Sequence, residues 1–517
     1  MSPTTGRPAV LVAAGIMLSR LFGLIRQRVF GHYFGASAAA DAFMAALRIP
    51  NLLQNLFGEG VLSASFIPVY AKLLAPDTEE EARRVAGAVA GLLGLVIGVL
   101  VVAGLLAAPV MVDVIAPGFA GEQRLQTIRL VRIFFPGTGL LVLSAWCLGI
   151  LNSHGRFFLS YAAPVAWNLA IIAALVGFGG RVESYDLAAA AAWGAVAGSG
   201  LQFLVQLPAV LSLAGPMRIT ARWATEHVRT ITRNFLPVFF GRGVLQISAY
   251  IDTFLGSLLP AGAVASLAYA QTLYLLPVSV FGMSVSAAEL PAMSRLHGAG
   301  GPALDELRHR LVTSLSRITF FVVPSAMALL VFGDVIAATV YQSGRFTGET
   351  ATYVWVILAG AAVGLLANTQ GRLYASTYYA LQDTRTPLRY SLVRVTLSIA
   401  LGWLLAFQLP PALGLEARWG VAGITLAASL AAWLEWFLLR RGLPFELGRS
   451  RQPVRQVAST VVAALAAAAL GWWLRGLTQQ IHPIVRGAVV LVGFGATYVG
   501  LTWLLRVPQA RGLIRKR

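Results

Sequence analysis

The chain has 517 residues, of which 57% are hydrophobic and only 12% are charged, and its mean hydropathy is +0.73. Soluble domains carry far more charge, so this composition excludes a soluble globular protein and identifies an integral membrane protein. The formal net charge of +19 does not indicate nucleic-acid binding, because the basic residues are spread over many short loops.

Long apolar stretches rich in Leu, Val, Ala and Gly recur through nearly the whole chain. Their length is typical of helical spans and not of the weak alternation seen in outer-membrane barrels. We therefore predict an all-α polytopic membrane protein with about fourteen transmembrane helices. The approximate spans are 9–33, 41–71, 85–111, 127–151, 160–178, 186–213, 232–258, 263–293, 310–341, 351–379, 388–409, 417–440, 455–475 and 483–505.

Basic residues alternate between the connections of these spans. One set of loops, which includes the C-terminal tail, holds roughly two dozen Lys and Arg, against about half a dozen in the opposite set. An even number of spans places both termini on the basic side. The pattern predicts a multi-pass protein of the bacterial cytoplasmic membrane with both termini cytoplasmic, in contact with anionic membrane lipids.

Weak internal repeats suggest a duplicated architecture. The sequence Asp-Val-Ile-Ala ends the third predicted span at 113–116 and recurs in the ninth at 334–337. Many transporters pair two related halves around a central site. The predicted organisation is an N-terminal six-helix lobe at 1–213, a cytoplasmic linker at 214–231, a C-terminal six-helix lobe at 232–441, and two extra helices with a basic tail at 442–517.

The first two spans contain a concentration of ionisable residues that is unusual for a bilayer. An ionisable group near the bilayer centre costs at least about 2.5–3.5 kcal/mol, so such groups usually face a water-filled cavity or a partner. We expect these spans to line a polar cavity. The residues concerned are Arg20, Arg26, Arg28, Asp41, Arg48 and Glu59.

The second span has one polar face on a helical wheel. Pro50 lies within this face, and we expect it to kink the helix around the cavity. The alternative is a structural network in which these groups satisfy one another. The polar face comprises Asp41, Arg48, Asn51, Asn55, Glu59 and Ser63.

The arginines of the first span indicate the chemistry of the cargo. Arg28 can extend to the membrane interface, whereas Arg20 and Arg26 lie deeper in the span. A guanidinium keeps its charge and offers a planar fork for bidentate hydrogen bonds to phosphate or carboxylate. The residues therefore predict an anionic cargo.

Several motifs resemble the MurJ/MviN family of lipid II flippases, and the likeness covers nearly the whole chain. The opening seventy residues carry the most specific part of it. The matching segments are Ser19-Arg20 with Gly23 and Arg26, Phe34-Gly35-Ala36, Asp41-Ala42-Phe43, Arg48-Ile49-Pro50-Asn51-Leu52-Leu53, Glu59-Gly60, Phe66-Ile67-Pro68, Ala116-Pro117-Gly118-Phe119, Gln342-Ser343-Gly344-Arg345-Phe346-Thr347 and Gln382-Asp383-Thr384-Arg385-Thr386-Pro387.

The resemblance implies two pseudo-symmetric six-helix lobes around a central cavity, plus two C-terminal helices. It implies a monomeric flippase, not an enzyme, that moves lipid II across the cytoplasmic membrane for peptidoglycan synthesis and cell-wall biogenesis. Arg20 and Arg26 match family arginines taken to hold the pyrophosphate, while Asp41 and Glu59 match acids that help to gate the cavity. We expect the headgroup to contact Arg48, Asn51 and Asn55 as well.

The chain departs from the family pattern at Gln54 and at Gln271-Thr272, where the family commonly carries charges. Our hypothesis is that Arg242, in the seventh span, replaces part of the lost positive charge and binds substrate. A structural pairing of Arg242 with Asp252 is an equal alternative.

The sequence does not identify one energy source for transport. There is no Walker-type motif, no metal-ligand cluster and no recognisable cofactor site. Asp252 and Asp383 are candidates for coupling to Na⁺ or H⁺. The membrane potential is another possible driver.

Three other functions stay open. A flippase for another polyprenyl-linked oligosaccharide fits the arginines equally well. A drug/cation antiporter of the multidrug and toxic compound extrusion (MATE) type predicts an apolar or acidic cavity, and a non-transporting scaffold leaves the polar face unexplained.

Overall fold

The computed structural model describes residues 6–57, 62, 65–75, 77–215, 217–220, 226–296, 301–443 and 452–514. Within these ranges, nothing is described of the side chains of 6–11, 13, 236–249, 301–303 and 513–514. The described chain is helical apart from turns and one β-bridge between Ser343 and Phe346. The predicted all-α class is confirmed.

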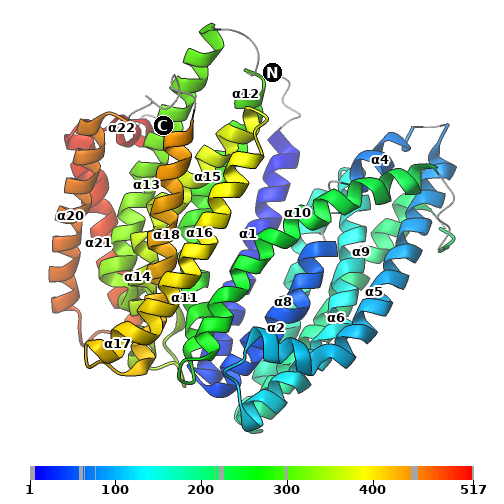
Figure 1. Cartoon of the computed structure of the whole chain (residues 1–517), viewed down its shortest axis with the longest axis horizontal. Coiled ribbons are helices and arrows are strands. Elements are labelled where there is room, and N and C mark those ends of the chain that lie inside the picture. The colour runs from blue at the N-terminus through cyan, green and yellow to red at the C-terminus, as the bar shows by residue number, and fades with distance from the viewer. Residues whose placement is uncertain are drawn as a thin grey trace. The chain divides into compact units, whose positions relative to one another are not determined.

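The chain divides into two compact units, Met1–Ala265 and Ser266–Arg517. The first unit is built of helices, which Figure 1 labels in chain order. They are α1 (Gly6–Phe34), α2 (Ala38–Phe57), α4 (Ile67–Lys72), α5 (Glu79–Ile115), α6 (Gly121–Ser153), α7 (Phe157–Ala162), α8 (Pro164–Phe178), α9 (Ser184–Ala214) and α10 (Glu226–Ser257).

Helix α6 is the centre of the first unit. In its most apolar window 83% of the residues are buried, against 28% in α5. It packs against α2, α5 and α9. The outward face of α5 carries exposed Leu106, Val110 and Val114, as expected for a helix that contacts lipid.

The second unit begins with the body of α11, which starts just before the division. It contains two π-helical segments, η1 and η2, and one 3₁₀ turn, η3. Its elements are α11 (Ala263–Pro277), η1 (Val278–Met283), α12 (Ser284–Ser294), α13 (Gly301–Tyr341), α14 (Gly348–Val363), α15 (Leu365–Ala380), α16 (Arg385–Trp403), η2 (Leu404–Gln408), α17 (Leu409–Ala412), η3 (Ala417–Trp419), α18 (Gly420–Gly442), α20 (Val454–Leu477), α21 (Pro483–Leu504) and α22 (Pro508–Ile514).

Helices α20 and α21 lie side by side within the second unit and pack on α13 (Figure 1). Small residues allow this close approach, because α20 presents buried Ala463 and Ala467 to the shared core. A Cβ atom at Gly471 would lie 2.6 Å from a ring atom of Phe332. Phe332 is also where α13 is kinked, with φ −121° and ψ 20°.

Ten described helices are long and apolar enough to cross a membrane, or eleven if the pair α14 and α15, bent by 43°, is one span. This confirms a polytopic membrane protein, while the count of fourteen stays a prediction. Helices α1, α2 and α10 are not among the ten. The first two contain Arg20, Arg26, Arg28, Asp41 and Arg48, which lower their apolar character.

The predicted domain bounds stay predictions. The compact units divide after Ala265, and α10 packs against α2, α4 and α5 of the first unit. Over the second predicted span, 41–71, the structure describes α2 (Ala38–Phe57) and α4 (Ile67–Lys72). α2 continues through Pro50 without a break in the helix.

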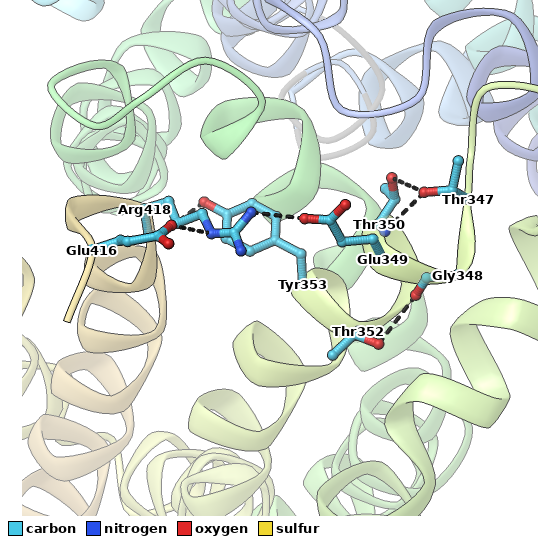
Figure 2. Close-up of polar contacts among 8 residues, drawn as sticks. All are labelled: Thr347, Gly348, Glu349, Thr350, Thr352, Tyr353, Glu416 and Arg418. Atoms are coloured by element: carbon cyan, nitrogen blue, oxygen red, sulfur yellow. Dashed lines mark hydrogen bonds and ion pairs between the residues drawn. The ribbon is translucent and has the colours of Figure 1, made fainter.

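An exposed polar network joins the start of α14 to the segment before α18 (Figure 2). The Arg418 guanidinium lies 2.8 Å from carboxylate oxygens of both Glu349 and Glu416. The Tyr353 hydroxyl donates to the Arg418 carbonyl at 2.9 Å. Because Glu349 and Glu416 are largely exposed, these ion pairs contribute little to stability.

A more buried ion pair holds α20 on α13. Arg475 donates to Asp334 Oδ2 at 2.7 Å, with side chains 19% and 13% exposed, and Asp334 Oδ1 has no hydrogen-bond partner among the described residues. The Arg475→Ala variant leaves this carboxylate unpaired, so we expect a loss of up to about 3 kcal/mol. Arg418→Ala is the matched control and should cost less than about 1 kcal/mol.

The measurement is thermal unfolding of the purified variants in one detergent. Equal losses for Arg475→Ala and Arg418→Ala would contradict a specific role of the buried pair.

Candidate functional site

The first-unit helix α1 carries three arginines, Arg20 and, in a later turn, Arg26 and Arg28. Arg20 is exposed, while Arg26 and Arg28 are half-buried. α1 packs along α7 and α8. The different exposures agree with an arrangement in which the three side chains do not share one face of the helix.

Arg26 is positioned by an aromatic ring from α8. Its guanidinium carbon lies 4.8 Å from the centroid of the Trp167 ring, a cation–π contact. Trp167 and Asn51 line one small cavity of about 10 Å³, next to Pro50 of α2. The cavity is barely large enough for a single water molecule, so Trp167 lies close to Asn51 and Pro50 of α2. Trp167 therefore lies next to both Arg26 of α1 and the polar face of α2.

Arg48 connects α2 to α10. Its guanidinium donates to Thr253 Oγ1 at 2.5 Å, and the Tyr250 hydroxyl donates to the Arg48 carbonyl at 3.0 Å. Asp252 lies on the same turn of α10 and attracts the Arg48 charge. Arg48 is thus an interhelical contact as well as a candidate ligand.

Asp41 holds the backbone where α11 begins. Its Oδ2 accepts from the Gly262 N–H at 2.6 Å, and its Oδ1 accepts from the Ala265 N–H at 2.7 Å. A carboxylate at a helix N-terminus is favoured because unpaired N–H groups and the helix dipole both attract it. Gly262 adopts φ +95°, and a Cβ there would lie 2.6 Å from the Ala36 carbonyl oxygen, so only glycine fits.

The remaining predicted residues are not all brought into this group. Asn55 is exposed on α2. Glu59 and the Arg242 side chain lie outside the described residues, so their predicted roles stay predictions. Asp383 lies in the loop before α16, where its carboxylate accepts from the N–H groups of Arg385 and Thr386, each at 3.0 Å.

The hydrogen-bonding pattern of Asp383 lowers the pKa of its carboxyl, chiefly through the Thr386 side chain and then through the backbone N–H groups. This side chain is therefore charged at neutral pH. Its geometry is that of a helix cap.

Three contributors to the site were missed by sequence reasoning: Trp167, Tyr250 and Thr253. Trp167 reads as an ordinary aromatic residue of an apolar span. Tyr250 and Thr253 flank Asp252, and this local cluster of polar residues is the signal that was available. Among the described residues, no group of three or more His, Cys, Asp or Glu side chains is arranged to hold a metal ion.

The chain is similar to known proteins over nearly its full length. A sequence model of the family described as "Lipid II flippase MurJ" matches residues 30–490. A Burkholderia cenocepacia protein named lipid II flippase MurJ is 32% identical, covering 97% of this chain and 98% of its own. A Rhizobium meliloti protein named probable lipid II flippase MurJ is 31% identical, covering 95% and 91%.

Solved structures support the fold. A structure described as lipid II flippase MurJ in an inward closed conformation matches with a TM-score of 0.79 and 22% identity, covering 98% of this chain and 100% of that one. An inward-facing MATE family multidrug transporter of the MOP superfamily matches with a TM-score of 0.64 and 16% identity, covering 84% and 97%.

The Asp41 contact is testable with a buried thiol. Cys147 is the chain's single cysteine, so Cys147→Ala gives a background in which Ala263→Cys, at a fully buried position, is the only thiol. Asp41→Asn replaces one of the two acceptor oxygens with an amide nitrogen, which leaves one buried N–H without its partner. Because leaving a buried donor unsatisfied costs about 1–3 kcal/mol, we expect maleimide labelling at 263 to accelerate about tenfold or more.

Asp383→Asn in the same background is the control, and its labelling rate should stay unchanged. Equal rates with and without the Asp41→Asn substitution would mean that this carboxylate does not hold the start of α11 closed.

Proposed function

Because the chain belongs to the MurJ lipid II flippase family, we propose that it moves lipid II from the inner to the outer leaflet of the bacterial cytoplasmic membrane. Lipid II is the undecaprenyl-pyrophosphate-linked precursor of peptidoglycan. The observation that carries the proposal is the match to the family over residues 30–490. The arginines of α1 and α2 support it, since an anionic headgroup needs fixed positive charge.

In this proposal, Arg20 and Arg26 bind the pyrophosphate, together with Arg48 and the amides of Asn51 and Asn55. The Trp167 ring supports the Arg26 guanidinium, which restricts its orientation. A planar guanidinium held in this way suits bidentate hydrogen bonds to phosphate oxygens. Arg242, in the sequence of α10, is proposed to contribute further positive charge to substrate binding.

Transport proceeds by alternating access, with Asp41 and Glu59 as gating residues. The headgroup enters from the cytoplasmic side while the lipid tail stays in the bilayer. Opening on the other side must weaken the contacts with the cargo, because a ligand held equally well by both states shifts no equilibrium. Release of Gly262 and Ala265 by Asp41 is the change we assign to one gate.

The architecture proposed for this cycle is two six-helix lobes around a central cavity, followed by two further helices. It has about fourteen spans in total, with both termini cytoplasmic. The protein works as a monomer among anionic lipids and binds no nucleic acid. α20 and α21 correspond to the two additional helices.

Energy comes from a Na⁺ or H⁺ gradient or from the membrane potential, and no other cofactor is required. Moving one unit charge across 100 mV is worth about 2.3 kcal/mol. Of the two candidate acids, Asp383 is engaged as a helix cap. Asp252, which interacts with Arg48, is therefore the acid to test first.

A second candidate cargo is another polyprenyl-linked oligosaccharide. It is favoured by Gln54 and by Gln271-Thr272, which stand where the family commonly carries charges, because a different headgroup needs a different set of contacts. A drug/cation antiporter is favoured less, since the arginines of α1 would repel a cationic cargo.

The decisive experiment is growth rescue in a bacterium depleted of its own lipid II flippase. The intact chain should restore growth, while Arg20→Ala and Arg26→Ala should not, because each removes a pyrophosphate contact. Arg84→Ala is the matched control, since Arg84 is an exposed residue paired with Glu80 on the surface of α5. Membrane levels of all variants are compared by immunoblot.

Rescue by both Arg20→Ala and Arg26→Ala, at the membrane level of the intact chain, would contradict the assigned roles of Arg20 and Arg26. If the intact chain inserts normally and fails to rescue, lipid II translocation in reconstituted vesicles separates a wrong cargo from an incompatible host.

A further inference from the structure

A second cluster of ionisable side chains lies in the Ser266–Arg517 unit and is not part of the predicted site. Arg394 on α16 donates to Glu435 Oε2 on α18 at 2.9 Å. The Ser391 hydroxyl donates to the other oxygen of the same carboxylate at 2.7 Å. Glu435 is only 8% exposed, so this carboxylate is well enclosed by its partners.

Two more helices join the same cluster. Arg394 donates to Asn368 Oδ1 on α15 at 3.3 Å, and Asn368 Nδ2 donates to the Tyr274 hydroxyl on α11 at 2.9 Å. The amide of Asn368 is thereby oriented by a partner on each side. Four helices of one unit converge on the Arg394 guanidinium and its hydrogen-bond partners.

Arg372 adds a second guanidinium to the cluster. It follows Asn368 by one turn on α15, so the two side chains share a helix face. It interacts electrostatically with Arg394, Tyr274 and Glu435. Its side chain is exposed, and within the described residues its guanidinium forms no hydrogen bond or ion pair.

The cluster therefore carries two positive charges and one negative charge. Arg372 lies about two turns before the end of α15, and Arg394 about two and a half turns after the start of α16, so both are about 12–14 Å from the connecting loop. At that distance along candidate membrane-spanning helices, an excess cation is costly unless an anion or water compensates it.

We propose that Arg372 and Arg394 form a second anion-binding site, which takes the phosphate oxygens of a lipid headgroup. Arg372 supplies the uncompensated charge. Arg394 supplies a planar guanidinium whose orientation is already restricted by its hydrogen bond to Asn368. Glu435 competes with the ligand for Arg394, which keeps the affinity low enough for release. That the ligand is the diphosphate of the transported lipid rests on the proposed function.

The test uses the purified full chain in detergent, in an Arg20→Ala/Arg26→Ala background that weakens binding at the first site. Farnesyl diphosphate, a short polyprenyl diphosphate, is titrated by isothermal calorimetry. Arg372→Gln should weaken binding at least fivefold. Glu435→Gln should strengthen it at least fivefold, because the competing carboxylate is neutralised.

Arg389→Gln is the matched control, since Arg389 is an exposed arginine in the first turns of α16. Its affinity should equal that of the background. Unchanged binding in Arg372→Gln overturns the proposal. This variant removes no hydrogen bond or ion pair formed with another described residue, so it keeps the test valid even if Glu435→Gln unfolds.

Three further probes identify the source of the phosphate. Farnesol should not bind, inorganic pyrophosphate should bind weakly, and dihexanoyl phosphatidylglycerol should bind more weakly than farnesyl diphosphate. Tighter binding of phosphatidylglycerol would overturn the assignment to the transported lipid.

Failure here is distinguishable from failure of the proposed function. If the chain rescues growth but shows no Arg372-dependent binding, only the second site is contradicted. If it binds farnesyl diphosphate through Arg372 but does not translocate lipid II, the proposed cargo is contradicted and the second site is supported.

Discussion

A guanidinium placed among apolar helices must find a partner, and this constraint organises both units. Arg48 is held by Thr253, Arg475 by Asp334, and Arg394 by Glu435. In each case the partner comes from a different helix. Because an ionised group without such a partner is expensive in apolar surroundings, each contact fixes the register of one helix against another.

The same constraint provides a way to bind an anionic cargo. A cation that is only partly compensated attracts a phosphate, while a cation fully paired with a carboxylate does not. Arg26 is supported by the Trp167 ring, and Arg372 interacts electrostatically with Glu435, the carboxylate that pairs with Arg394. Arg26 and Arg372, which our proposals assign to ligands, thus differ from Arg475 in their partners and not in their residue type.

Local sequence signals were enough to identify several features. Hydropathy predicted the helical class, because each span must be apolar over its own length. The short motifs around Arg20, Arg26 and Asp41 indicated the family, because each motif is contiguous in the chain. Hydropathy did not identify α10 as part of the first compact unit, since that assignment depends on its packing against α2 and α5.

The sequence by itself determined the membrane class, the family and the arginines and acids that carry charge into the apolar spans. Only the tertiary structure decided what those charges contact. Thr253 is 205 positions away from Arg48, and Gly262 is 221 positions away from Asp41. No periodicity or motif links residues so far apart, because their proximity results from the packing of helices that are individually stable in an apolar environment.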